Sequence, residues 1–178
     1  MGHAQRVADY ATKLAREVGV QGWDLTWLRI GAYIHDLGNM AVPEEVLRKA
    51  DDLNDQEREL MKVHTIMGDS MAKQLDFPAE VRPIVRSHHE QWAGEGYPDK
   101  LAGEKIPFGA RIVSIADVFD AQLIRSMIYG PDSRPSLAEA QVWLRSSIRD
   151  FEAAGVTLAL ETYEQVPTED LVGVIERV

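Results

Sequence analysis

The spacing between histidines and apolar residues is the feature that most constrains the fold of this chain. Its five histidines are His3, His35, His64, His88 and His89. His3 lies four residues before Val7, and His88 lies four residues after Ile84. Residues three or four apart share one face of an α-helix, so these rings are expected on the apolar sides of their helices. A buried imidazole is costly unless it is hydrogen-bonded or binds a metal. We therefore expect the fold to bring the histidines together.

Apolar residues recur at helical spacing along most of the chain, and the expected fold class is all-α. There is no sustained strand-like alternation and no Asn-Gly or Asp-Gly hairpin signal between apolar runs. The expected helices carry the stripes Val7 to Val18, Leu25 to Ala32, Leu60 to Leu75, Val81 to Val85 and Val113 to Ile124. A short helix is expected after Pro43, and two more are expected over 136–153 and from Thr168. The sequence thus predicts a multi-helix bundle.

Composition limits the kinds of site that the chain can build. It has 178 residues, no cysteine and a formal net charge of −10. The length suits one domain, and the lack of cysteine excludes disulfides, thiolate metal sites and cysteine nucleophiles. No apolar run approaches the roughly 20 residues of a membrane helix, and no signal peptide is visible, so we expect a cytoplasmic protein without a membrane partner. The negative charge argues against DNA or RNA, and an anionic substrate would need a local positive centre such as bound metal ions.

Carboxylates accompany the histidines at matching positions. Asp36 directly follows His35, while Asp117 follows Val113 by one helical turn and Asp120 lies one turn further. One histidine on an apolar face is more often a hydrogen-bonded core residue than a ligand, and the two later aspartates taken alone would be surface charges. Imidazole and carboxylate together, however, are the ligands of divalent transition metals. The joint pattern predicts a metal site.

The pair His88-His89 indicates the width of that site. Neighbouring side chains on a helix point about 100° apart, so both rings serve one site only if it is wide, as a site with more than one metal is. His3 is the weakest of the candidate ligands, because a histidine in a Met-Gly-His start can also lie at a frayed terminus without binding metal.

Five short motifs follow one another between residue 3 and about residue 121, over roughly two-thirds of the chain. They are His3 with Arg6-Val7-Ala8, His35-Asp36-Leu37-Gly38 with Val42-Pro43, Met61-Lys62-Val63-His64, His88-His89-Glu90 with Gly94-Glu95-Gly96-Tyr97-Pro98, and Ala116-Asp117-Val118-Phe119-Asp120-Ala121. In this order, and with the Gly-Tyr-Pro triplet, the motifs resemble the HD-GYP family within the HD superfamily of metal-dependent phosphohydrolases.

The resemblance implies a helical HD-domain bundle with metal ions, often iron or manganese, in its centre. It also implies hydrolysis of the bacterial second messenger cyclic di-GMP. Asp36 would bridge two ions and is the expected catalytic residue. The other expected ligands are His3, His35 and Asp117 for one ion and His64, His88 and His89 for the other. A glutamate before the first histidine accompanies a third ion in some members and falls outside this sequence, so two divalent ions are expected.

Five residues are expected on the substrate side: Asn39, Lys62, Tyr97, Arg111 and Arg125. Tyr97 is expected to stack on a guanine, with a purely structural turn as the alternative. Lys62 and Arg111 are candidate phosphate partners, with a solvent-facing ion pair as the alternative for each. The family usually has a lysine where Asn39 stands, and an arginine-containing segment where only Arg125 is a stand-in. Both departures predict weaker substrate contacts.

The resemblance also suggests how the chain is organised. Residues 1–129 are expected to form the metal-binding catalytic core, and residues 130–178 are expected to form closing C-terminal helices of the same domain. The substrate, a cyclic dinucleotide, is the expected small-molecule partner. The expected protein partner is an upstream sensor or receiver domain, or a second copy in a homodimer. Two other functions stay open: a phosphohydrolase acting on another nucleotide, and a catalytically weakened, metal-bearing signalling or binding module.

Overall fold

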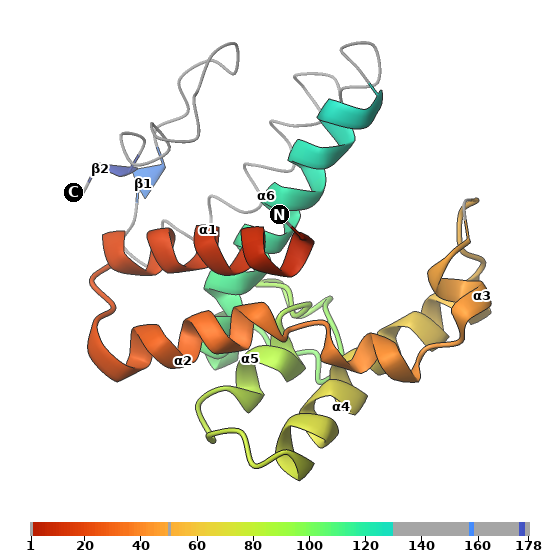
Figure 1. The fold of residues 1–178 in the computed structure, drawn as a ribbon, viewed down its shortest axis with the longest axis horizontal. Coiled ribbons are helices and arrows are strands. Elements are labelled where there is room, and N and C mark those ends of the chain that lie inside the picture. The colour runs from red at the N-terminus through yellow and green to blue at the C-terminus, as the bar shows by residue number, and fades with distance from the viewer. Residues whose placement is uncertain (1, 50, 130–156, 159–174, 177–178) are drawn as a thin grey trace.

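The described part of the chain is built almost wholly of helices (Figure 1). The computed structural model describes residues 2–49, 51–129, 157–158 and 175–176. Its α-helices are α1 (His3–Glu17), α2 (Gly22–Tyr33), α3 (Glu44–Leu47), α4 (Asp55–Gln74), α5 (Arg82–Ser87) and α6 (Phe108–Tyr129). Two 3₁₀ turns, η1 (Leu37–Ala41) and η2 (Gly103–Lys105), connect them. The all-α prediction is confirmed.

The helix bounds follow local sequence signals. Asn54 caps α4: its side chain accepts a hydrogen bond from the Glu57 amide, and the Glu57 carboxylate accepts one from the Asn54 amide. After α1, Gly19 adopts a φ of +86°, which reverses the chain toward α2. The short helix expected after Pro43 is α3.

The apolar core joins α1, α2, α5 and α6. Alanines line much of it, so α1 can pack closely against both α2 and α6 (Figure 1). The buried residues are Val7, Ala8, Ala11, Ala15, Leu28, Ala32, Ile84, Ile112, Val113 and Ala116. This core holds one side of the histidine site, because α1 and α6 carry His3 and Asp117.

A backbone contact between η1 and α4 holds the other side. A Cβ atom added to Gly38 would lie 1.8 Å from the His64 carbonyl oxygen and 2.5 Å from the Gly68 amide nitrogen. Only glycine fits such an approach. The contact brings the peptide after Asp36 against the helix that carries His64.

Two sequence predictions need correction. Leu60 and Leu75 are 44% and 64% exposed, so the ends of their stripe do not face the core. The buried residues of α4 are His64, Thr65, Gly68 and Ala72, which all lie between the two ends of the stripe. The helix predicted from Thr168 is wrong at Ile175–Glu176, which form strand β2, paired antiparallel with β1 (Thr157–Leu158). Ile175 is β-branched, a residue type that favours extended structure. The helix predicted over 136–153 lies outside the described residues.

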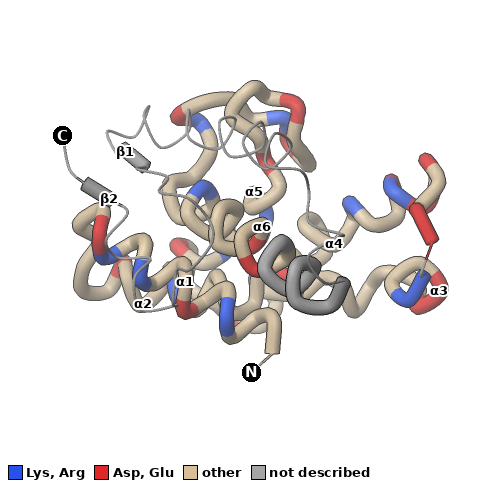
Figure 2. The backbone as a smooth tube through the Cα atoms, turned by 90° about the horizontal axis from the view of Figure 1, so that it is seen from above, with Lys and Arg blue, Asp and Glu red and all other residues tan. Residues whose placement is uncertain are grey.

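Lysine and arginine segments are interspersed with aspartate and glutamate segments along the described chain (Figure 2). Near α3, for example, Glu44 pairs with Arg48 and Lys49 pairs with Glu57. No helix among the described residues is long and apolar enough to cross a membrane.

Candidate metal centre

Five segments bring the seven predicted metal ligands together. They supply His3 from α1, His35 and Asp36 from the α2–η1 junction, His64 from α4, His88 and His89 from the end of α5, and Asp117 from α6. Within each of three trios the candidate ligand atoms all lie within 4.8 Å of one another; the trios are His64-His88-His89, His3-His35-Asp117 and His35-Asp36-His88.

Asp36 lies between two sets of rings and offers one carboxylate oxygen to each. Its Oδ2 atom lies 3.5 Å from Nε2 of His35 and 4.0 Å from Nε2 of His3. Its Oδ1 atom lies 3.5 Å from Nε2 of His64 and 4.0 Å from Nε2 of His88. The two oxygens therefore face different groups of nitrogens, as in a carboxylate that bridges two cations.

Main-chain carbonyls fix the orientation of three rings. In His35, His64 and His88, Nδ1 lies 2.8, 2.7 and 2.8 Å from the carbonyl oxygen three residues earlier. A carbonyl oxygen only accepts, so Nδ1 must carry the proton and donate it. Nε2 of each ring then faces Asp36 and the centre of the site.

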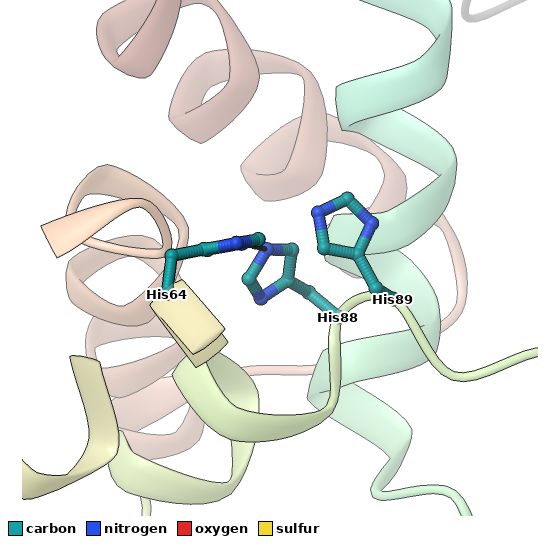
Figure 3. A group of neighbouring side chains, drawn as sticks. All are labelled: His64, His88 and His89. Atoms are coloured by element: carbon teal, nitrogen blue, oxygen red, sulfur yellow. Dashed lines mark hydrogen bonds between the residues drawn. The ribbon is translucent and has the colours of Figure 1, made fainter. Parts of the chain in front are cut away.

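His64, His88 and His89 form a cluster that we call the histidine half (Figure 3). The three rings lie close together, with centroids 5.3 Å apart for His64 and His88, 4.2 Å for His88 and His89, and 5.0 Å for His64 and His89. Burial, followed by the neighbouring imidazoles, lowers the pKa of His88 well below its usual value. Burial and His64 lower the pKa of His89 to about 4. The rings of His88 and His89 are therefore neutral near pH 7 and can act as ligands.

His3, His35 and Asp117 form the opposite cluster, which we call the carboxylate half. Oδ1 of Asp117 lies 3.2 Å from Nε2 of His3 and 3.7 Å from Nε2 of His35. Hydrogen bonding to Asp117, with a smaller part from Asp120, outweighs desolvation and raises the pKa of His3 to about 9. Burial alone would raise the pKa of Asp117, but its contacts with His3 and His35 outweigh burial and lower that pKa.

The polar atoms inside the site fit cations. Nε2 of His35 is buried and has no hydrogen-bond partner. Nε2 of His64 and Nε2 of His88 lie 3.3 Å apart and face one another, while Nδ1 of each ring donates to a main-chain carbonyl. Such unpaired buried groups are unfavourable, and a divalent metal between imidazole and carboxylate ligands would satisfy them.

Comparison with known proteins agrees with this geometry. The HD domain family matches residues 1–147. The chain belongs to the HD domain family. The chain is 33% identical over 168 residues to the 3'3'-cGAMP-specific phosphodiesterase 2 of Vibrio cholerae. The aligned residues cover 92% of this chain and 31% of that protein. It is 38% identical over 121 residues to the cyclic di-GMP phosphodiesterase response regulator RpfG of Xanthomonas campestris, over 67% of this chain and 32% of that protein. The chain thus spans about a third of the length of these relatives.

A solved structure shares the fold. An HDG"Y"P protein from Bdellovibrio bacteriovorus superposes with a TM-score of 0.60 at 23% identity, over 80% of this chain and 51% of that one. The HD-domain bundle and the HD-GYP resemblance predicted from the sequence are confirmed. His and Asp clusters in an HD domain indicate metal ions at this site.

Asp120 is a residue of this HD domain whose position sequence reasoning left undecided. Its side chain is fully buried, so the surface-charge alternative is wrong. Its Oδ2 atom accepts a hydrogen bond of 2.8 Å from Nδ1 of His3, and Arg6 donates to both of its oxygens. The helical spacing from Asp117 was the available signal, but the partner of Asp120 lies 117 residues away in the sequence.

Tyr97 lies beside the histidine half of the HD domain. Its ring stacks on His89 with centroids 4.8 Å apart and 26° between the ring planes. Burial raises the pKa of the Tyr97 hydroxyl, so the group stays protonated at neutral pH. Nζ of Lys62 lies 5.8 Å from the Tyr97 centroid, and it also donates a hydrogen bond to Glu59. The ion pair given as the alternative for Lys62 is therefore present, and the base stacking of Tyr97 and the phosphate contact of Lys62 stay predictions.

A buried glutamate orders the loop that carries Tyr97. The Glu90 carboxylate accepts hydrogen bonds from the amides of Asp99 at 2.7 Å and Leu101 at 2.9 Å. Gly94 has a φ of +80°, whereas Gly96 is needed for space, because a Cβ there would lie 2.3 Å from the Gln91 amide nitrogen. The loop is thus a structured turn that also places Tyr97 at the site.

The other predicted substrate residues are placed less simply. Asn39 lies in η1, with its Oδ1 buried and without a hydrogen-bond partner. The Arg111 guanidinium lies 5.0 Å from the ring centroid of Phe108 and 5.8 Å from that of Trp92. Arg111 Nε is buried without a hydrogen-bond partner, and no ion pair joins Arg111 to another described residue, so the solvent-facing ion pair given as its alternative is not seen. Its phosphate contact stays a prediction. Arg125 lies on α6, and its side chain is outside the described part of the structure.

Proposed function

We propose that this HD domain is a metal-dependent phosphodiesterase that hydrolyses a cyclic dinucleotide, with cyclic di-GMP as the substrate. The position of Asp36 carries the proposal, because its two oxygens face the two halves of the site separately. The named activities of the relatives support it. The alternatives of a different nucleotide substrate and of a weakened signalling module are outcomes of the test below.

The proposed centre holds two divalent ions, iron or manganese. Asp36 would bridge them, with His3, His35 and Asp117 completing one subsite and His64, His88 and His89 the other. When bound, a pair of such ions supplies an activated water and stabilises charge on the phosphodiester oxygens. The carbonyl partners of Nδ1 in His35, His64 and His88 aim Nε2 of each ring inward.

The substrate side would use the wall formed by Tyr97 and Lys62. A base stacked near Tyr97 would place its phosphate toward the centre, and the Lys62 ammonium would meet that charge if it left Glu59. Asn39 offers an amide in place of a cation, which weakens attraction to phosphate. Arg111 would have to leave its aromatic packing to reach substrate. Arg125 stays a proposed contact.

A second substrate, 3'3'-cGAMP, has specific support. A relative named for that substrate matches 92% of this chain at 33% identity, whereas the RpfG match covers 67%. Both molecules present the same kind of phosphodiester ring and differ in one base. We rank cyclic di-GMP first because the Gly-Tyr-Pro motif is intact.

The organisation of the whole protein belongs to the same proposal. Residues 1–129 would be the catalytic core and 130–178 would close the domain, in a cytoplasmic protein. A sensor or receiver domain, or a second copy, would be its protein partner.

A substrate panel tests the function. Protein loaded with Mn(II) or Fe(II) would be incubated with cyclic di-GMP, 3'3'-cGAMP, linear di-GMP and a mononucleotide phosphodiester, and the products would be resolved by chromatography. We expect metal-dependent cleavage of cyclic di-GMP fastest. Faster cleavage of 3'3'-cGAMP would replace the substrate and keep the reaction. No hydrolysis of any of these by metal-loaded protein would overturn the proposed activity and favour the signalling module.

A further inference from the structure

His3 differs from the other anchored histidines in the partner of its outer nitrogen. His35, His64 and His88 each use the carbonyl three residues earlier in the chain. His3 is the first residue of α1, and its Nδ1 instead lies 2.8 Å from Oδ2 of Asp120 on α6. Its orientation therefore depends on a side chain from another helix.

Asp120 is held in turn by Arg6. Nε of Arg6 lies 2.6 Å from Oδ1 and a terminal guanidinium nitrogen lies 3.0 Å from Oδ2. Arg6 is one helical turn after His3, so both reach Asp120 from the same face of α1. A fully buried carboxylate is costly without a charged partner, and this two-point contact supplies one and fixes the plane of the carboxylate.

The contact determines which nitrogen of His3 faces the site. Because Nδ1 bonds outward to Asp120, Nε2 points inward, 3.2 Å from Oδ1 of Asp117 and 4.0 Å from Oδ2 of Asp36. Outer carboxylates that orient a ligand ring typically change metal affinity about 10- to 100-fold when removed.

We propose that Asp120, held by Arg6, is the positioning residue for the metal subsite of His3, His35 and Asp117, and sets its affinity separately from that of the histidine half. This inference rests on the proposed metal centre but not on the identity of the substrate. No described contact joins Asp120 to His64, His88 or His89, so the second subsite should not respond to its loss.

Metal titration of Asp120→Asn tests the proposal. Mn(II) binding would be measured by calorimetry, and the ions retained after desalting would be counted by elemental analysis. We expect wild type to hold two ions, and Asp120→Asn to hold one tightly and the other about 10- to 100-fold more weakly. Arg6→Gln should weaken the same ion by a smaller factor, since Asp120 keeps its bond to His3.

Asp69→Asn is the matched control. Asp69 is a largely buried carboxylate that also bonds to arginine, 2.9 Å from Nε of Arg82, but no described contact links it to the histidines. It should alter thermal unfolding of the metal-free protein without changing either metal affinity.

A spectroscopic readout separates positioning from simple helix clamping. In Co(II)-loaded protein, each ring bound through Nε2 gives a shifted NMR signal from its Nδ1 proton. Loss of one such signal in Asp120→Asn, with the others retained, is expected. If Asp120→Asn folds poorly, the same NMR signals and metal affinities measured in Arg6→Gln test the proposal instead. Unchanged signals and affinities in both variants would overturn the inference, whereas a wild type that binds no metal would overturn the proposed centre itself.

Discussion

The two halves of the metal centre face the same aspartate yet have opposite proton chemistry. In the carboxylate half, Asp117 and Asp120 raise the pKa of His3 to about 9. In the histidine half, burial lowers the pKa of His89 to about 4 and that of His88 well below its usual value. Without metal at pH 7, the His3 ring therefore carries a second proton, whereas the rings of His88 and His89 are neutral.

This difference shows that the types of ligand alone do not determine whether a site must lose a proton before it binds a metal ion. His3 must release a proton before its Nε2 can bind a cation. The neutral rings of His88 and His89 can bind a cation without losing a proton. The negative charge of Asp117 compensates by attracting the cation. The two subsites therefore respond differently to pH and to mutation.

The largest effect is expected where the halves meet. Asp36→Ala removes both oxygens that face the two halves. Loss of a residue that only hydrogen-bonds a metal ligand costs up to about 100-fold in affinity. Loss of Asp36 itself should therefore lower both metal affinities and the hydrolysis rate by more than about 100-fold. Metal counting and a kcat measurement check this. Asp9→Ala, on α1 and paired with Arg29, is the control. Loss of only one ion in Asp36→Ala would show that Asp36 does not serve both halves.

A smaller effect is expected from the wall of the histidine half. Tyr97→Leu removes the ring that stacks on His89. Stacking of a base on an aromatic ring contributes about 1–3 kcal/mol to binding, and the low end of that range corresponds to a rise in KM of about 10-fold. Tyr97→Phe keeps the ring and should stay near wild type. Steady-state kinetics with each cyclic dinucleotide provide the measurement. Equal KM values for all three proteins would remove Tyr97 from the substrate wall.

The smallest effect concerns the stability of metal-free protein. The pKa of His89 lies below its unfolded value, so its contribution increases as pH rises from about 4 to 6.5. The pKa of His3 lies above its unfolded value, so its contribution is full below pH 6.5 and is lost as pH rises through about 9. Denaturant unfolding with chelator, from pH 4 to 10, should show stability greatest near pH 6.5.

Variants assign the two limbs of that profile. His89→Asn should flatten the acid limb, and His3→Asn should flatten the alkaline limb. If the loss of stability at alkaline pH persisted unchanged in His3→Asn, the raised pKa of His3 would not be its cause.

Much of the fold was predictable because helical periodicity is local. The stripes predicted α1, α2 and α4, although exposed Leu60 shows that periodicity does not say how far packing extends. The gathering of ligands was also predictable, from five motifs in a known order. The link between Asp120 and His3 was not, because it joins the two ends of the core across 117 positions. The aromatic packing of Arg111 likewise depends on neighbours that the pattern does not reveal.

The contact between Gly38 and Gly68 has a consequence for engineering this centre. It sets the approach of the peptide after Asp36 to α4 through main-chain atoms and without using a ligand. A ligand side chain can therefore be exchanged without changing the distance between η1 and α4. A single methyl group at Gly38 would instead push the two segments apart, and would change every ligand–ligand distance that spans them.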